Sequence, residues 1–177
     1  MTLGNADRLL KVLVLLTGLL VGGVASAAET PKPGSNNAGK KTALTALLAN
    51  LNKIEETCDV KRFSCGLGAR SILLTTDCAL DDGTFVDFWL FDGTIGDTVI
   101  VDLKSGAFDS FLFLLDTTPE VVAVDDDSGE GTNSRISFEL GVTGEWTIAA
   151  NNFFPLSEDP GLYTVELSCN PIREGNR

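Results

Sequence analysis

Clustered carboxylates are the side chains in this sequence best suited to chemistry. Asp125, Asp126 and Asp127 follow a strand-like apolar run, and Asp81 and Asp82 lie together in an earlier turn. Paired carboxylates act as acid and base in glycoside hydrolysis, and alternating oxygens can bind calcium. Adjacent aspartates in polar turns more often accept hydrogen bonds from nearby backbone N–H groups. Catalysis, metal binding and a structural turn are therefore the three readings of these clusters.

The aspartate triplet fits a structural corner better than a metal site. An EF-hand loop that began at Asp125 would need a glutamate at its twelfth position, where the sequence has Ile136. We therefore expect the three aspartates to accept hydrogen bonds from turn N–H groups, with Asn133 or Arg135 as partners.

The composition excludes several function classes. The chain has no histidine, so Ser-His-Asp and Cys-His catalysis and histidine-bound zinc are ruled out. Its net charge of −12 disfavours nucleic acids and anionic membrane surfaces, which select basic patches. We therefore expect a protein that is not an enzyme and binds no nucleic acid.

The first 27 residues have the pattern of a secretory signal. Arg8 and Lys11 form a basic start, residues 12–24 are apolar, and residues 25–27 read Ala-Ser-Ala, a cleavage pattern. The apolar run is shorter than the roughly 20 residues that span a membrane. We predict a secreted or periplasmic protein whose mature form begins near Ala28 and has no membrane span.

Four cysteines follow this segment: Cys58, Cys65, Cys78 and Cys169. None belongs to a Cys-x-x-Cys pair, which disfavours a zinc site. In an exported protein the cysteines favour two disulfides. Three pairings are possible, and we favour a local Cys58–Cys65 link with a Cys78–Cys169 link between the ends of the domain.

The rest of the chain divides by pattern. Residues 28–39 are rich in Pro, Gly, Asn and Ser and form a predicted flexible leader. Residues 40–57 form a possible amphipathic helix, residues 58–170 the predicted domain and residues 171–177 a tail. The apolar stripe of the helix consists of Leu44, Leu47, Leu48, Leu51 and Ile54.

Apolar and polar residues alternate with a period of two from residue 69 onward. This pattern predicts eight strands: Ala69–Thr75, Thr84–Phe91, Asp97–Leu103, Asp109–Asp116, Glu120–Val124, Arg135–Leu140, Glu145–Ala150 and Leu162–Ser168. Strands at this spacing with no helix between them indicate an antiparallel sandwich or barrel, and we predict an all-β fold, an antiparallel β-sandwich. The second and fourth are apolar on both faces, so we expect them to be central or to be covered on their second face by the helix or a partner.

Five stretches, in order along the chain, carry a family resemblance: VDFWLFDGTIGDTVIVDL, GAFDSFLFLLD, VVAVDDDSGEGTNSRISFEL, TGEWTIAANNF and GLYTVELSC. Together they resemble the bacterial pre-peptidase C-terminal domain, a family similar to the collagen-binding domains of bacterial collagenases. The resemblance implies a jelly-roll-like sandwich without catalytic residues, usually appended to secreted peptidases. No peptidase domain precedes it here, so we expect a module without an attached enzyme.

The resemblance also implies a calcium site. In the collagen-binding relatives, acidic residues before the sandwich and at the entry to an early strand share one ion. Glu56 and Asp59 resemble the first group, and Asp82 and Asp87 resemble the second. Calcium, if bound, is therefore expected at these four residues, and no other cofactor is expected.

Two functional classes stay open. The first is a module that binds an extracellular protein or polysaccharide through exposed aromatics such as Phe111, Phe113, Phe153 or Phe154. For the first two of these, burial in the second face of the sheet is the favoured alternative. The second class is a structural or envelope component that self-assembles or partners through its helix or an exposed sheet face. Binding to purified matrix polymers would favour the first, and concentration-dependent self-association the second.

Overall fold

The computed structural model describes residues 37–49, 58–156 and 161–170. The predicted signal peptide, most of the leader and the tail lie outside these ranges. The described residues form helix α2 (Asn37–Leu48) and ten strands. The strands are β1 (Val60–Arg62), β2 (Leu67–Leu73), β3 (Cys78–Ala79), β4 (Phe85–Gly93), β5 (Thr98–Ser105), β6 (Ser110–Leu115), β7 (Val121–Asp125), β8 (Ser134–Glu139), β9 (Gly144–Asn152) and β10 (Gly161–Asn170).

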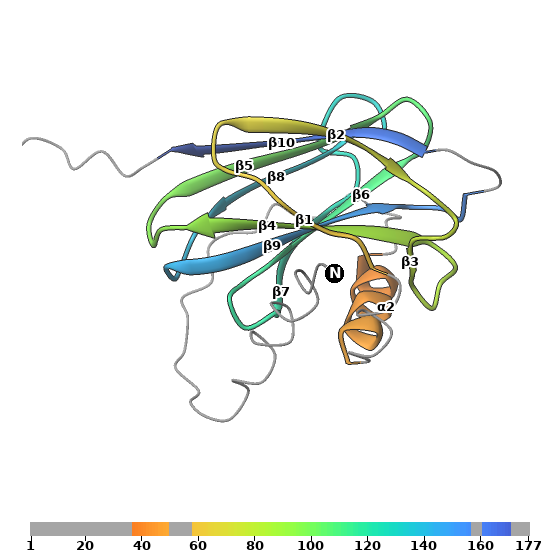
Figure 1. Ribbon diagram of the computed structural model, residues 1–177, viewed down its shortest axis with the longest axis horizontal. Coiled ribbons are helices and arrows are strands. Elements are labelled where there is room, and N and C mark those ends of the chain that lie inside the picture. The colour runs from red at the N-terminus through yellow and green to blue at the C-terminus, as the bar shows by residue number, and fades with distance from the viewer. Residues whose placement is uncertain (1–36, 50–57, 157–160, 171–177) are drawn as a thin grey trace, which may run out of the picture.

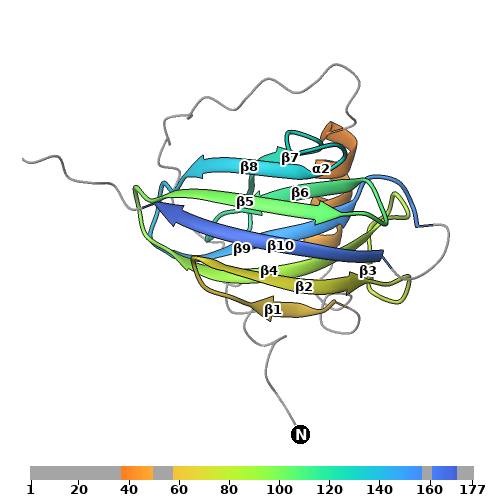
Figure 2. The same cartoon turned by 90° about the horizontal axis from the view of Figure 1, so that it is seen from above.

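The strands form two sheets that pack face to face. The six-stranded sheet has the order β1-β4-β9-β6-β7 with β3 also beside β4, and the four-stranded sheet has the order β2-β10-β5-β8. The chain passes back and forth between the sheets, so strands adjacent in sequence mostly lie in different layers (Figure 1). Figure 2 shows the four-stranded sheet from its outer side, lying across the other sheet. The predicted β-sandwich is confirmed.

Each of the eight predicted strands corresponds to an observed strand, and two strands were missed. β1 has three residues and β3 has two, too few to establish an alternating pattern. β1 also pairs parallel to β4, whereas the other pairings in both sheets are antiparallel. Both short strands lie against β4, where β3 pairs with its first two residues and β1 with the stretch from Phe88 to Leu90.

The six-stranded sheet is apolar on both faces, because its central strands alternate between two cores. In β4, Trp89 and Phe91 face the four-stranded sheet, while Phe88 and Leu90 face away from it. The outward-facing core is completed by α2, which covers this side of the sheet as a third layer (Figure 1). The prediction that the doubly apolar strands would be covered is therefore confirmed, and the cover is the chain's own helix.

Helix α2 begins at Asn37, three residues before the predicted start at Lys40, and its last helical residue is Leu48. The second half of the predicted helix, residues 50–57, lies outside the described ranges. Within the helix, Leu44 is fully buried and Leu47 is 3% exposed, as their helical spacing requires for one face to meet the sheet. Tertiary packing thus stabilises a helix that would be marginal alone.

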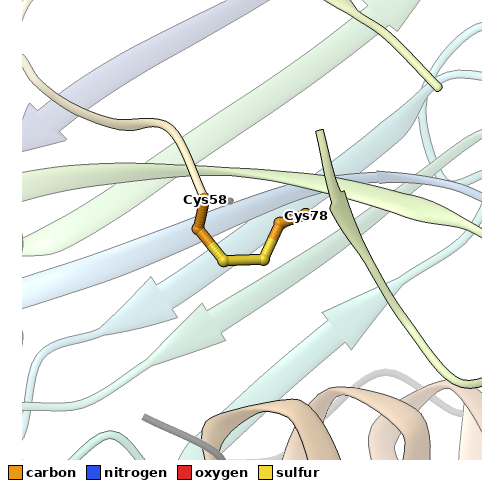
Figure 3. Close-up of a disulfide and its surroundings, with 2 residues drawn as sticks. All are labelled: Cys58 and Cys78. Atoms are coloured by element: carbon orange, nitrogen blue, oxygen red, sulfur yellow. A yellow bond between two sulfur atoms is a disulfide. The ribbon is translucent and has the colours of Figure 1, made fainter. Parts of the chain in front are cut away.

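The two disulfides differ from the predicted pairing, which is wrong. Cys58 bonds to Cys78 and Cys65 bonds to Cys169, so no described cysteine is free. Cys65 and Cys169 continue the antiparallel ladder of β2 and β10, in which Leu67 lies opposite Leu167. The other bond ties the segment entering β1 to β3, the two pieces that share one edge of β4 (Figure 3).

Candidate functional site

Two lysines lie in polar networks, one on each side of the six-stranded sheet. β1 places Lys61 opposite Trp89 of β4, where its Nζ lies 5.3 Å from the ring centroid. The same Nζ lies 2.8 Å from Asp59 Oδ2 and 3.0 Å from Asp87 Oδ2. Burial lowers the pKa of Lys61, but the two carboxylates outweigh this effect and the pKa is raised.

Asp87 is the centre of this Lys61 network. It is fully buried, and its Oδ2 accepts hydrogen bonds from Lys61, from the Tyr163 hydroxyl and from Ser71 Oγ at 3.3 Å. Trp89 Nε1 in turn donates to the Tyr163 oxygen at 3.0 Å. Burial and the nearby Asp87 carboxylate raise the pKa of Tyr163 strongly. Because Ser71 and Tyr163 belong to the four-stranded sheet, Asp87 joins the two sheets through polar contacts.

The predicted calcium residues are only partly brought together. Glu56 lies outside the described residues, Asp59 and Asp87 share Lys61, and Asp82 instead pairs with Lys40 at 3.2 Å. Across the described ranges, no group of three acidic, histidine or cysteine residues is placed to hold a metal ion. The described residues do not fit calcium as they stand, because the Lys61 ammonium lies between the two carboxylates that the ion would share. Calcium binding stays a prediction.

The second network surrounds Lys40, which projects from α2 onto the outward face of the six-stranded sheet and is only 3% exposed. Its Nζ donates to Asn152 O at 2.7 Å, and to Thr84 Oγ1 and Asn151 Oδ1 at 3.1 Å each. The Asp82 carboxylate, at 3.2 Å, supplies the opposite charge. Burial lowers the pKa of Lys40, and this effect exceeds the raising effect of Asp82.

The aspartate triplet lies at the turn between β7 and β8. Asp125 Oδ2 accepts hydrogen bonds from the backbone N–H of Ser128 at 3.1 Å and of Arg135 at 2.7 Å, the geometry of a side chain that stabilises a turn. The Arg135 guanidinium itself bonds to Asp102, and Asn133 Oδ1 accepts from Ser105 N at 3.0 Å. These two side chains therefore connect the turn to β5.

The four candidate aromatics are divided between interior and surface. Phe111 and Phe113 are fully buried in the core beneath α2, and Phe153 packs partly against that core. Phe154 is 62% exposed. An aromatic binding surface that includes Phe111 and Phe113 is therefore excluded.

No described element covers the outer face of the four-stranded sheet (Figure 2). Ile72 of β2 and Leu162 of β10 lie directly opposite each other there and are 41% and 58% exposed. Further along the face, Arg135 pairs with Asp102, and Lys104 with Glu166 at 2.6 Å. This face therefore carries an exposed aliphatic pair and, beside it, charged side chains that form ion pairs.

Sequence patterns did not single out Lys40 or Lys61, although one signal was present. Lys40 lies four residues before Leu44 and therefore on the same face of the helix. This apolar face is the one that packs against the sheet. Lys61 has no such signal, because its partners Asp87 and Trp89 are reached only through the pairing of β1 with β4.

The described chain thus defines a disulfide-linked β-sandwich with a helix packed on one outer face. Residues 85–152 match the family model of the bacterial pre-peptidase C-terminal domain. The resemblance drawn from the sequence is confirmed for this segment, which spans β4 to β9. No curated protein sequence matches the chain.

Several solved structures resemble the fold at low sequence identity. The pre-peptidase C-terminal domain of collagenase from Bacillus anthracis has 11% identity and a TM-score of 0.48, covering 64% of this chain and 98% of that chain. PliG, a periplasmic inhibitor of g-type lysozyme from Aeromonas hydrophila, has 12% identity and a TM-score of 0.42, with coverages of 64% and 99%. CorA, a surface-associated copper-binding protein from Methylomicrobium album BG8, has 9% identity and a TM-score of 0.44, with coverages of 63% and 98%.

Proposed function

We propose that the protein is an exported, non-catalytic module that binds an extracellular protein through the outer face of its four-stranded sheet. One observation carries the proposal: α2 covers the outer face of the six-stranded sheet, whereas no described element covers the corresponding face of the four-stranded sheet. The match to the pre-peptidase C-terminal family supports a binding role, because that resemblance implies a module without catalytic residues.

Export is supported by the two disulfides, which form and persist in oxidising compartments. The predicted signal in residues 1–27 agrees with export, although it lies outside the described residues. Within the described ranges, no helix has the length and apolarity that crossing a membrane requires. The disulfides and the predicted signal thus support our proposal of a periplasmic or extracellular protein.

The composition of the uncovered face favours a protein as the partner. Its outward side chains on the four described strands include no aromatic ring, and such rings are the usual stacking surfaces for sugars. The face offers instead an aliphatic pair, Ile72 and Leu162, beside alternating charges. Apolar contacts surrounded by polar groups are the usual anatomy of a protein interface.

A binding assay with purified polymers tests this proposal. Mature protein is passed over immobilised fibrillar collagen, other purified extracellular proteins and insoluble polysaccharides, and the dissociation constants are compared. We expect saturable binding to a protein, weakened at least about tenfold by Leu162→Asp, since an uncompensated charge at an interface costs more than 1.4 kcal/mol. The matched control is Ile95→Asp, in the turn between β4 and β5, where the parent side chain is 62% exposed.

Three outcomes would contradict the proposal. Binding that is unchanged by Leu162→Asp would place the interface elsewhere. Selective binding to a polysaccharide would replace the proposed class of partner. Concentration-dependent self-association without a ligand, abolished by Leu162→Asp, would show that the same face serves assembly.

A further inference from the structure

The Lys40 network holds an amine, a carboxamide and a carboxylic acid group within reach of one another. Lys40 Nζ lies 3.1 Å from Asn151 Oδ1 and 3.2 Å from Asp82 Oδ2. Asn151 is fully buried, and Lys40 is 3% exposed. An amine and a carboxamide can condense to a new amide with release of ammonia, and burial side by side supplies the proximity that such a reaction needs.

We propose that Lys40 and Asn151 condense to form an amide bond that fastens α2 to β9 covalently. The Asp82 carboxylate accepts a proton from the Lys40 ammonium. The neutral Nζ then attacks Asn151 Cγ, and a new Nζ–Cγ bond forms while the Cγ–Nδ2 bond breaks. The leaving nitrogen takes the proton that Asp82 carried and one from Nζ. The products are one secondary amide and one ammonium ion, so atoms and charge balance without an oxidant or reductant.

A proton path between Asp82 and the leaving nitrogen is already in place. Thr84 Oγ1 donates to Asp82 Oδ1 at 2.6 Å and accepts from Asn151 Nδ2 at 3.1 Å. The hydroxyl can therefore pass a proton from the acid to Nδ2 while receiving another, as general acid catalysis requires. The orientation of the Asn151 amide is set independently, because Nδ2 also donates to Phe85 O at 2.6 Å.

The reacting atoms are close to contact. The 3.1 Å separation of Nζ from Oδ1 and a C=O bond of about 1.2 Å put Nζ within about 4.3 Å of Asn151 Cγ. Attack needs a separation of about 3–3.5 Å, so a movement of about 1 Å brings the pair into a reactive geometry.

Burial of Lys40 makes its neutral form easier to reach, and one hydrogen-bond acceptor for the product is already in place. Burial lowers the pKa of Lys40, and the rings of Phe111 and Phe153, with centroids 5.8 and 5.6 Å from Nζ, shield the site from water. After condensation, Nζ keeps one hydrogen, for which Asn152 O at 2.7 Å is the acceptor. Asp82, whose side chain is 30% exposed, keeps its hydrogen bonds from Thr84. Condensation removes Asn151 Nδ2, so Phe85 O and Thr84 Oγ1 each lose one donor.

Intact-mass spectrometry of the folded mature protein tests the proposal. The purified protein is incubated at neutral pH until its mass is constant, and the mass is compared with the value calculated for two disulfides. We expect the parent protein to be lighter than this value by one ammonia molecule. Proteolysis should yield a branched peptide that joins the segments containing Lys40 and Asn151.

Three variants assign the reaction to its residues. Lys40→Arg keeps the positive charge but cannot form the amide, and it should show the full calculated mass. Asp82→Asn keeps the amine and the carboxamide but removes the proton acceptor, and it should also stay unreacted. Lys41→Arg is the matched control: Lys41 is the neighbouring lysine, and its Nζ donates to Val121 O at 2.8 Å. This control should lose ammonia as completely as the parent.

Each contrary result has a definite meaning. A parent protein with the full calculated mass would overturn the proposal, whatever the variants do. Loss of ammonia that persists in Lys40→Arg would show that another amide reacts. Complete condensation in Asp82→Asn would exclude Asp82 as the proton acceptor. Circular dichroism of each variant confirms that the unreacted protein is folded.

Discussion

The Lys40 and Lys61 networks are two solutions to the same problem, a lysine ammonium brought into a protein interior. Lys61, which is 27% exposed, lies within 3.0 Å of two carboxylates, and its pKa is raised. Lys40, which is 3% exposed, has one carboxylate at 3.2 Å and otherwise neutral oxygens, and its pKa is lowered. Loss of solvent is the largest influence on both groups.

The direction of each pKa shift follows the number of charged partners of the lysine. Neutral oxygens accept the hydrogen bonds of Lys40, but they do not offset the free-energy cost of removing solvent from a full charge. A second carboxylate at Lys61 reverses the balance. The pKa of Lys61 is therefore shifted in favour of the ammonium, and the pKa of Lys40 in favour of the neutral amine.

Removal of Asp87 should be the most damaging change in the Lys61 network. Asp87→Ala leaves Lys61 and Tyr163 without their shared acceptor between the sheets. Breaking a buried ion pair from one side typically costs about 3–5 kcal/mol, and we expect a loss in this range by urea denaturation. The control is Asp59→Ala, which removes the 56% exposed partner of Lys61 and should cost less than about 1 kcal/mol. Equal losses of stability would mean that the two carboxylates contribute equally to the Lys61 network.

The helix that carries Lys40 should depend on its apolar contacts. Leu44→Ala removes a fully buried side chain from the core beneath α2 and should destabilise the protein by about 2–5 kcal/mol. Thr42→Ala, on the exposed side of the helix, should change stability by less than about 0.5 kcal/mol. If thermal unfolding of Leu44→Ala matches that of the parent, α2 does not pack on its own sheet in solution.

The two networks should respond differently to loss of one hydroxyl. Thr84→Val removes the group that links Asp82 to Asn151, both in the Lys40 network, and should cost about 1–3 kcal/mol because buried polar atoms lose their partner. Ser71→Ala should cost only about 0.5–1.5 kcal/mol, since Asp87 keeps its bonds from Lys61 and Tyr163. Chemical denaturation of both variants measures the difference, and the reverse order would contradict the comparison.

Alkaline pH should weaken the contribution of Lys61. Burial lowers its pKa, but the carboxylates raise it more, so the folded value lies above the ordinary 10.5. A raised folded pKa contributes stability that is fully present below 10.5 and is lost as pH rises through the folded value. The stability difference between the parent and Lys61→Met should therefore shrink above pH 10.5. If the stability difference between the two proteins grew with pH, the pKa of Lys61 would be lowered on folding rather than raised.

Calcium should have the smallest effect on the parent protein. Because Lys61 already neutralises Asp59 and Asp87, we expect melting temperatures in calcium and in chelator to agree. Calorimetry with and without calcium measures this directly. A rise in calcium that disappears in Asp87→Ala would instead support the metal site that the family resemblance implies.

Most of the sandwich could be predicted from the sequence because strand patterns are local. Alternation within segments such as Ile136 to Leu140 reports which side chains are buried, and it needs no knowledge of the neighbouring strand. The double-sided apolarity of β4 and β6 likewise predicted strands that are central or covered by the helix or a partner, and the structure shows the helix as the cover. The role of Asp125 in a turn was also accessible, since turn hydrogen bonds join residues a few positions apart.

The disulfide pairing and both lysine networks were not accessible in this way. Cys65 meets Cys169 because β2 and β10 pair in one particular register, and Lys61 meets Asp87 because β1 lies parallel to β4. Register depends on how whole faces fit together, and it is not encoded in the residues that flank either partner. Local patterns thus predicted eight of the ten described strands and the helix, and the composition excluded histidine chemistry. The cysteine pairing and the oxygens around each lysine depend on the fold, because those contacts join segments that lie far apart in the chain.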